Sequence, residues 1–194
     1  FDKTAVFMSS GLFAMIAGIA CTKALASRFD KRKLMIALTL LNAFSVALFF
    51  VIPPEQYGLM LLVNAIGTFI VGPTPALVWA MYADTADYGE WKSGRRTTAL
   101  VFSALQFAQK MGLAVGAGLL GFILSFFGFI ANQEQSEFSI TGIRLMFSVL
   151  PAILAVSGAV AIYFYPLTDV KVREIEVALK KRHGSEEEAK AIPA

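Results

Sequence analysis

The sequence predicts an all-α fold, a polytopic transmembrane helix bundle with five spans. Of its 194 residues, 57% are hydrophobic and only 16% are charged, whereas about a quarter of the residues in a soluble domain are charged. The hydrophobic residues form long runs without the regularly spaced polar residues of a solvated helix face. Such runs are close to the roughly 20 residues with which a helix crosses a bilayer, so the composition excludes a soluble domain.

The expected spans are helical, because a helix satisfies its own backbone polar groups in lipid. Gly72, Pro73 and Pro75 should kink or loosen the third span, since each proline removes a backbone donor. Residues 1–167 are expected to form an incomplete C-terminal transmembrane bundle, followed by a tail at 168–194. The spans are expected at 4–25, 34–52, 57–82, 97–127 and 142–165.

Lysine and arginine are concentrated in alternate loops. The segments 28–33 and 92–96 and the tail are basic, whereas the loops 53–56 and 128–140 contain neither residue type. The positive-inside rule therefore predicts a cytoplasmic C-terminus and an external N-terminus. The net charge of +3 does not indicate nucleic-acid binding, because the basic residues flank hydrophobic runs and are not interleaved with exposed aromatic residues.

The tail carries a possible amphipathic helix. Val172, Ile175 and Leu179 recur at helical spacing among basic residues, which is typical of a helix at the membrane surface. The alternative is a solvated basic tail that only fixes the topology. After Gly184 the sequence SEEEAKAIPA has no apolar face to bury, and we expect it to be disordered.

The ends and the cysteine content give two smaller indications. The chain begins at Phe1 with no charged segment before the first apolar run, so we expect a truncated chain and no signal peptide. Cys21 is the single cysteine, which excludes a disulfide framework. No spacing of metal ligands is present, and we expect no metal site, no cofactor and no catalytic residue.

Lys110 is the most informative polar residue, because it lies deep inside the fourth expected span. A lysine near the bilayer centre costs roughly 2.5 kcal/mol or more unless it faces a cavity or a counter-charge. Helical spacing places Ser103, Gln106 and Lys110 on one face, which we expect to line a cavity; a structural ion pair is the alternative. The pair Gly112 and Gly116 in the same span is typical of close helix packing.

The third span carries a second polar stripe. Asn64, Thr68, Pro75, Trp79 and Tyr82 fall on one face at helical spacing. Broken helices in transporters often border the binding cavity, so Trp79 is a candidate for contact with the substrate. The alternative is that Trp79 and Tyr82 are aromatic residues at the membrane interface.

Charged residues of both signs follow this stripe in the loop expected between the third and fourth spans. Asp84 and Asp87 precede Arg96 at spacings that permit ion pairing within the turn or to a neighbouring domain. We interpret these three residues as a candidate cytoplasmic gate, with solvated flanks as the alternative. No histidine lies nearby, which argues against hydrolytic chemistry.

At this loop the sequence becomes similar to a known family. The stretch 82–110, YADTADYGEWKSGRRTTALVFSALQFAQK, resembles the region around helices ten and eleven of the glycoside-pentoside-hexuronide:cation symporters. These are the melibiose permease-like carriers of the major facilitator superfamily. The turn SRFDKRK at 27–33 extends the resemblance, which covers most of the chain.

The resemblance implies a twelve-helix fold in which this chain corresponds to helices eight to twelve and the tail. In such carriers a sugar shares a central cavity with a coupling cation, Na⁺, Li⁺ or H⁺. The aspartates that form most of the cation site lie on the N-terminal six-helix bundle, which this chain lacks. The implied partners are therefore a sugar, membrane lipid and that bundle, and the implied location is the bacterial inner membrane.

The resemblance also implies roles for individual residues. Lys110 matches the family's lysine near the cavity, and Gln106 matches a polar neighbour one turn away. Asp84, Asp87 and Arg96 match charges that hold the two bundles together on the cytoplasmic side. The family's aromatic sugar contact falls near Pro75, with Trp79 one turn further along. The sequence thus departs from the family pattern at that contact.

Taken together, the residues and the resemblance predict a secondary active transporter that couples sugar symport to Na⁺ or H⁺ and is not an enzyme. Three alternatives remain at this point. An intramembrane enzyme would need a catalytic acid or metal ligand facing the membrane interior. A structural membrane subunit would use Lys110 only to pair with a partner's acid. A relative that carries lipid would share the fold of the symporters.

Overall fold

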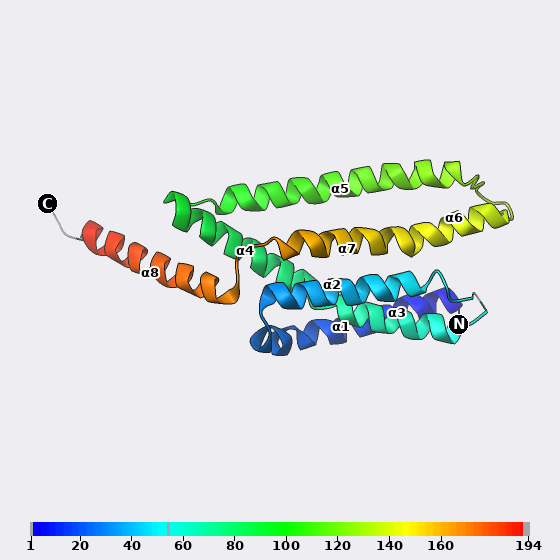
Figure 1. The fold of residues 1–194 in the computed structure, drawn as a ribbon, viewed down its shortest axis with the longest axis horizontal. Coiled ribbons are helices and arrows are strands. Elements are labelled where there is room, and N and C mark those ends of the chain that lie inside the picture. The colour runs from blue at the N-terminus through cyan, green and yellow to red at the C-terminus, as the bar shows by residue number, and fades with distance from the viewer. Residues whose placement is uncertain (1, 54, 192–194) are drawn as a thin grey trace.

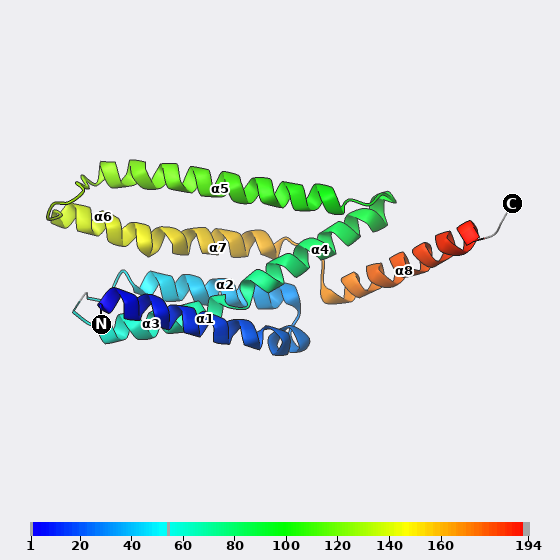
Figure 2. The same cartoon turned by 180° about the vertical axis from the view of Figure 1, so that it is seen from behind.

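The computed structural model describes residues 2–53 and 55–191, and the regular structure of this part is entirely helical. The membrane-length helices run side by side along the long axis of the molecule (Figures 1 and 2). The predicted all-α fold is therefore confirmed. The helices are α1 (Lys3–Arg28), α2 (Lys31–Leu48), α3 (Tyr57–Val71), α4 (Thr74–Ser93), α5 (Thr98–Phe126), α6 (Glu137–Phe147), α7 (Val149–Tyr163) and α8 (Asp169–Ala191).

Four helical stretches of the described part are long and apolar enough to cross a membrane: Lys3–Arg28, Tyr57–Ser93, Thr98–Phe126 and Glu137–Tyr163. Together with the predicted fold they identify an integral membrane protein. The remaining expected span corresponds to α2, which is less apolar because its 18 residues begin with three basic ones. It nevertheless lies alongside the others (Figure 1).

The third expected span is broken at Gly72 and Pro73, as the sequence predicted. α3 ends at Val71 and α4 begins at Thr74, because Pro73 cannot donate a backbone hydrogen bond. The break also lets α1 approach closely: a Cβ atom on Gly18 would lie 2.2 Å from the Phe69 carbonyl oxygen, and one on Gly72 would lie 2.6 Å from the Met15 carbonyl oxygen. Glycine is therefore required for this backbone contact.

Two expected boundaries were wrong. The stretch after Tyr82 is not a loop but a continuation of α4, which ends only at Gly94 with a φ of +70°, a conformation that glycine adopts readily. The last span begins at Glu137 and not near 142, because the Ser136 side chain accepts a hydrogen bond from the Ser139 N–H and caps α6. A second break, at Ser148, separates α6 from α7.

The packed core joins the first four helices and α7, whereas α5 stands apart. Leu34, Met35, Leu38 and Leu77 form a buried cluster between α2 and α4. No residue of α5 is buried, and its contacts are mainly with α4 and α6, at its two ends. The described part thus leaves the length of α5 uncovered (Figures 1 and 2). Within the described residues, nothing lies within 4 Å of the position that a Cβ atom would take at Gly112 or Gly116.

The tail forms a helix that packs on protein. Val172, Ile175 and Leu179 of α8 are buried with Leu167 and contact Tyr88 of α4. The periodicity that predicted an amphipathic helix was therefore correct, but its apolar face is covered by α4, which leaves little of it for the membrane surface. α8 projects beyond the end of the bundle (Figures 1 and 2).

The expected disorder after Gly184 is contradicted up to Ala191, where α8 ends. Glutamate, alanine and lysine are strong helix formers, so this segment continues the helix although it has no apolar face to bury. Residues 192–194 of the segment lie outside the described residues.

Candidate functional site

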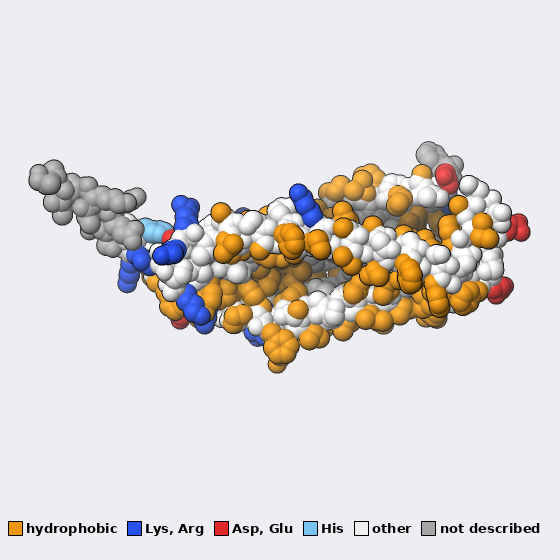
Figure 3. Space-filling view, turned by 90° about the horizontal axis from the view of Figure 1, so that it is seen from above, with side chains coloured by type: hydrophobic (Ala, Val, Ile, Leu, Met, Phe, Trp, Pro, Cys, Tyr) orange, Lys and Arg blue, Asp and Glu red, His pale blue; other side chains and the backbone are white. Residues whose placement is uncertain are grey.

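Most charged side chains lie near the two ends of the molecule. Figure 3 shows lysine and arginine side chains gathered at the end from which α8 projects, some acidic side chains at the opposite end, and between them a largely hydrophobic surface interrupted by an isolated basic side chain. We call the first of these the basic end. The predicted gate residues all lie there, on α4 and in the turn that leads to α5.

Asp84 pairs with a residue that the sequence analysis had treated only as a marker of topology. Its side chain is buried, and its Oδ2 lies 2.5 Å from the Nζ of Lys31. Lys31 is the first residue of α2, within the SRFDKRK turn. In the sequence, only its place in this turn could have indicated that Lys31 takes part in the site. The ion pair joins the basic end of α2 to that of α4.

Asp87 and Arg96 lie together about one turn further along α4, also facing α8. Both line a polar cavity of about 300 Å³ between α4 and α8, and Glu90 at its rim lies 2.8 Å from the Nε2 of His183. The three predicted gate residues are thus divided between two neighbouring groups, and Lys31 joins Asp84. The cavity is also lined by Thr98, Glu176, Leu179 and Lys180.

The turn after α4 is fixed by side-chain contacts. The Thr97 hydroxyl donates a hydrogen bond of 3.0 Å to the Ala86 carbonyl oxygen. A Cβ atom on Gly89 would lie 2.3 Å from that hydroxyl oxygen, so only glycine leaves room for Thr97 there. The turn therefore places Arg96 against α4 and starts α5 at a defined position.

Asp30 organises the turn between α1 and α2. Its Oδ1 accepts hydrogen bonds from the N–H groups of Arg32 and Lys33 at 3.1 and 3.2 Å. Its Oδ2 accepts another from the N–H of Asp169, the first residue of α8, at 3.0 Å. Burial alone would raise the pKa of Asp30, but these donors and the nearby Lys33 charge outweigh burial and lower the pKa below its ordinary value.

The candidate cavity residues of α5 are all exposed. Ser103, Gln106 and Lys110 lie on a helix with no buried residue, and the Ser103 hydroxyl donates only within its own helix, to the Leu100 carbonyl oxygen at 3.0 Å. Their helical spacing keeps them on one face. The described part of the chain does not cover this polar face.

Trp79 lies where α4 meets α5. It is 48% exposed, and its ring stacks on that of Phe102 with 5.8 Å between centroids and 18° between planes. Asn64, expected on the same stripe, instead donates a 3.0 Å hydrogen bond to the Phe7 carbonyl oxygen of α1. The two residues expected on one stripe thus contact different helices, Asn64 α1 and Trp79 α5.

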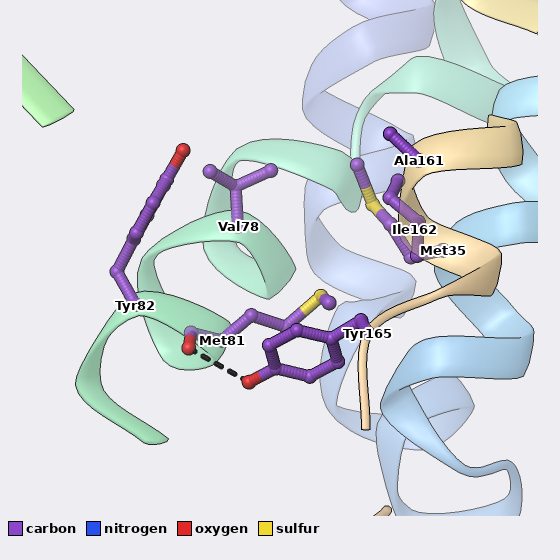
Figure 4. Close-up of a pocket in the computed structure, with 7 residues that line it drawn as sticks. All are labelled: Met35, Val78, Met81, Tyr82, Ala161, Ile162 and Tyr165. Carbon is purple, nitrogen blue, oxygen red and sulfur yellow. Dashed lines mark hydrogen bonds between the residues drawn. The ribbon is translucent and has the colours of Figure 1, made fainter. Parts of the chain in front are cut away.

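A separate cavity of about 290 Å³ lies between α2, α4 and α7 (Figure 4). The Tyr165 hydroxyl donates a 3.0 Å hydrogen bond to the Met81 carbonyl oxygen beside it. The other side chains are almost all apolar, so its chemistry suits an apolar group and not a sugar. The lining residues are Met35, Val78, Met81, Tyr82, Ala161, Ile162 and Tyr165.

Comparison with known proteins gives a consistent family. A family model described as MFS/sugar transport protein matches residues 2–169. The chain is 32% identical over 188 residues to a putative glycoside/cation symporter of Escherichia coli (strain K12), which covers 94% of this chain and 40% of that protein.

Two further relatives agree with this match. A glucuronide carrier protein homolog of the same strain is 33% identical over 179 residues, or 92% of this chain and 39% of the carrier. A putative sulfoquinovose importer of Salmonella typhimurium is 30% identical over 182 residues, or 91% and 38%. The chain therefore spans about two fifths of the length of these curated relatives, and all three are named as transport proteins.

Proposed function

Since the chain belongs to the MFS/sugar transport protein family, as its resemblance to the glycoside/cation symporters predicted, we propose that it is the C-terminal part of a carrier that couples sugar symport to a cation by alternating access. Family membership indicates transport and symport, and not enzymatic catalysis. In the whole carrier, an N-terminal six-helix bundle would face α4 and α5.

The observation that carries the proposal is the open polar face of α5. Ser103, Gln106 and Lys110 are exposed on a 29-residue helix that is otherwise apolar enough to cross a membrane. In lipid a lysine at this depth is costly, so the face needs a polar cavity or a counter-charge. A central cavity between two bundles supplies both, and Trp79 at the junction of α4 and α5 would border it.

Lys110 would act there by changing partners. Its ammonium can pair with carboxylates contributed by the N-terminal bundle, where the family resemblance implies the main Na⁺ or H⁺ site. If cation and sugar each alter that pairing, each ligand binds the two states of the carrier with different affinity, which is what coupling requires. The protein itself needs no cofactor for this step.

The basic end would then act as the gate of the carrier. Asp84, Asp87 and Arg96 lie there on and after α4, and we propose that they contribute to closing this end against the N-terminal bundle. The basic residues of the same end favour a cytoplasmic location for it and for the C-terminus. The bacterial inner membrane is the membrane that fits this family assignment.

The proposed substrate class rests on the names of these relatives, which refer to a glycoside, a glucuronide and sulfoquinovose. What these share is a sugar ring with several hydroxyl groups, some with an acidic substituent. We therefore propose a glycoside, pentoside or related sugar as the substrate, with lipid as the surrounding solvent and no nucleic-acid partner.

Counterflow of labelled sugars tests the proposal in the full-length carrier. A panel of glycosides, glucuronides and pentosides is assayed with Na⁺ present or replaced by K⁺ at two external pH values. Accumulation of at least one sugar that depends on Na⁺ or on the proton gradient supports symport. If none of the panel moves, the structural-subunit alternative is favoured over transport.

Lys110→Ala is the decisive variant within that assay. It should abolish cation-driven accumulation while the amount of inserted protein changes little, because the lysine face is not part of the packed core. Lys110→Arg should rescue only in part, since a planar guanidinium is a different donor from a compact ammonium. If Lys110→Ala accumulates sugar like the parent, the proposed role of Lys110 is wrong.

A further inference from the structure

The start of α8 meets the start of α2 at the basic end (Figures 1 and 2), and the two helices exchange hydrogen bonds. Asp30, which caps α2, accepts the N–H of Asp169 at 3.0 Å. In return Asp169 Oδ2 accepts the N–H of Lys31 at 3.2 Å. The two aspartates thus form a reciprocal clasp between the α1–α2 turn and α8.

The Asp169 side chain is not needed to cap its own helix. Thr168 already caps α8: its hydroxyl accepts the Lys171 N–H at 3.4 Å, and its carbonyl oxygen accepts the Val172 N–H at 2.9 Å. The Asp169 carboxylate instead faces Lys31, whose Nζ lies 3.8 Å from its second oxygen, Oδ1. Both carboxylate oxygens of Asp169 are therefore directed at one residue of another helix.

Lys31 is the residue that also binds Asp84, at 2.5 Å. A lysine side chain is flexible, and fixing it for one ion pair costs conformational entropy. Asp169 reduces that cost, because it holds the backbone of Lys31 and keeps a second negative charge beside its ammonium. The three side chains are only 23%, 10% and 29% exposed for Lys31, Asp84 and Asp169, so solvent screens the cluster incompletely.

We propose that Asp169 is a positioning residue for the gate: it holds Lys31 on Asp84, so that the tail helix determines how firmly α2 and α4 are joined at the basic end. α8 is fixed in turn by its buried face on α4, where Ile175 and Leu179 pack with Tyr88. α2, α4 and α8 therefore form one body at this end. The inference rests on the proposed function only where it calls this end the gate.

The test uses a cysteine-free full-length carrier with a single reporter, Ser103→Cys, on the open face of α5. An impermeant maleimide is added to inverted membrane vesicles, and the labelling rate per inserted protein reports opening at the basic end. Asp169→Asn removes the charge but keeps an acceptor oxygen. It should raise the labelling rate about twofold to fivefold, the factor expected for a partly screened ion pair.

A double-mutant comparison separates positioning from a general effect at the helix terminus. Lys31→Gln should raise the rate to a similar extent, and adding Asp169→Asn to it should cause no further increase. Glu174→Gln removes one negative charge from an exposed position of the same helix and should leave the rate unchanged. Asp169→Ser, a second neutral variant, serves if Asp169→Asn inserts poorly.

Two results would overturn the inference: parental labelling in both neutral variants, or an undiminished effect of Asp169→Asn in the Lys31→Gln background. Sugar counterflow is measured separately, in vesicles that contain the full-length carrier with Ser103 intact. If that carrier moves no sugar, the proposed function fails, while the labelling comparison still decides whether Asp169 positions Lys31.

Discussion

Asp30 receives three backbone N–H groups on its two carboxylate oxygens, from Arg32, Lys33 and Asp169. A carboxylate is a better acceptor than a protonated carboxyl group, so these donors favour the charged form. This preference explains why the pKa of Asp30 lies below its ordinary value although the group is partly buried. Protonation of Asp30 in acid should therefore destabilise the turn between α1 and α2.

The lowered pKa predicts how stability depends on pH. Since the folded pKa lies below the unfolded value of 3.8, the carboxylate contributes stability above that value and loses it as the pH falls through the folded pKa. Asp30→Asn should therefore lower the thermal unfolding temperature of the detergent-purified carrier at pH 6. The difference from the parent should shrink as the pH falls below 3.8.

Glu174→Gln is the matched control for this experiment, because Glu174 is an exposed acid whose loss should leave the unfolding temperature nearly unchanged at either pH. An Asp30→Asn difference that stays constant over the whole pH range would contradict the assigned cause, since the remaining effect would then come from shape and not from charge.

The apolar face of α8 leads to a second prediction. Ile175 is only 3% exposed against α4, whereas Val177 on the same helix is 53% exposed. Truncating a buried isoleucine to alanine costs about 2–5 kcal/mol, a large loss for a helix whose other contacts include the polar ones at Asp169 and His183. Ile175→Ala should therefore free α8 while the membrane-spanning part stays folded.

Limited trypsin digestion of the purified carrier measures that release, because α8 carries several lysine and arginine residues. The tail of Ile175→Ala should be cut several times faster than that of the parent, and Val177→Ala should be cut at the parental rate. Equal rates for the two variants would show that the buried face does not hold α8 in place.

The helices show which structural features could be predicted from the sequence. Gly72 and Pro73 predicted the break between α3 and α4, because both act on the backbone of their own helix. The spacing of Val172, Ile175 and Leu179 predicted which face of α8 is apolar, but periodicity does not encode a partner, and α4 was not foreseen. The extension of α4 to Ser93 was missed because charge was interpreted as a loop.

The polar residues of the candidate site could be predicted from the sequence, but their contacts could not. A lysine in mid-span marks its own helix face as polar, so the face with Ser103, Gln106 and Lys110 could be derived from spacing alone. The pairing of Lys31 with Asp84 could not, because it joins residues 53 positions apart in sequence. Such a contact depends on how α2 packs against α4, which no local pattern records.

For the whole molecule, the distribution of lysine and arginine leads to a prediction of topology. These side chains gather at the basic end (Figure 3), from which α8 projects (Figure 1). Positively charged loops are retained on the cytoplasmic side during insertion. We therefore expect the Gly94 turn and α8 to be cytoplasmic and the loop between α5 and α6 to be external.

Single cysteines on the two sides test this orientation in the cysteine-free full-length carrier. Ser93 and Gln133 are both exposed and lie at opposite ends of α5, so the two variants form a matched pair. Gln133→Cys should react with an impermeant maleimide added to intact cells, and Ser93→Cys should react only in inverted vesicles. The reverse pattern would mean that the basic end faces outward. In that case the charged group around Asp84 would lie on the external side, and it would act as the external gate of the carrier instead of the cytoplasmic one.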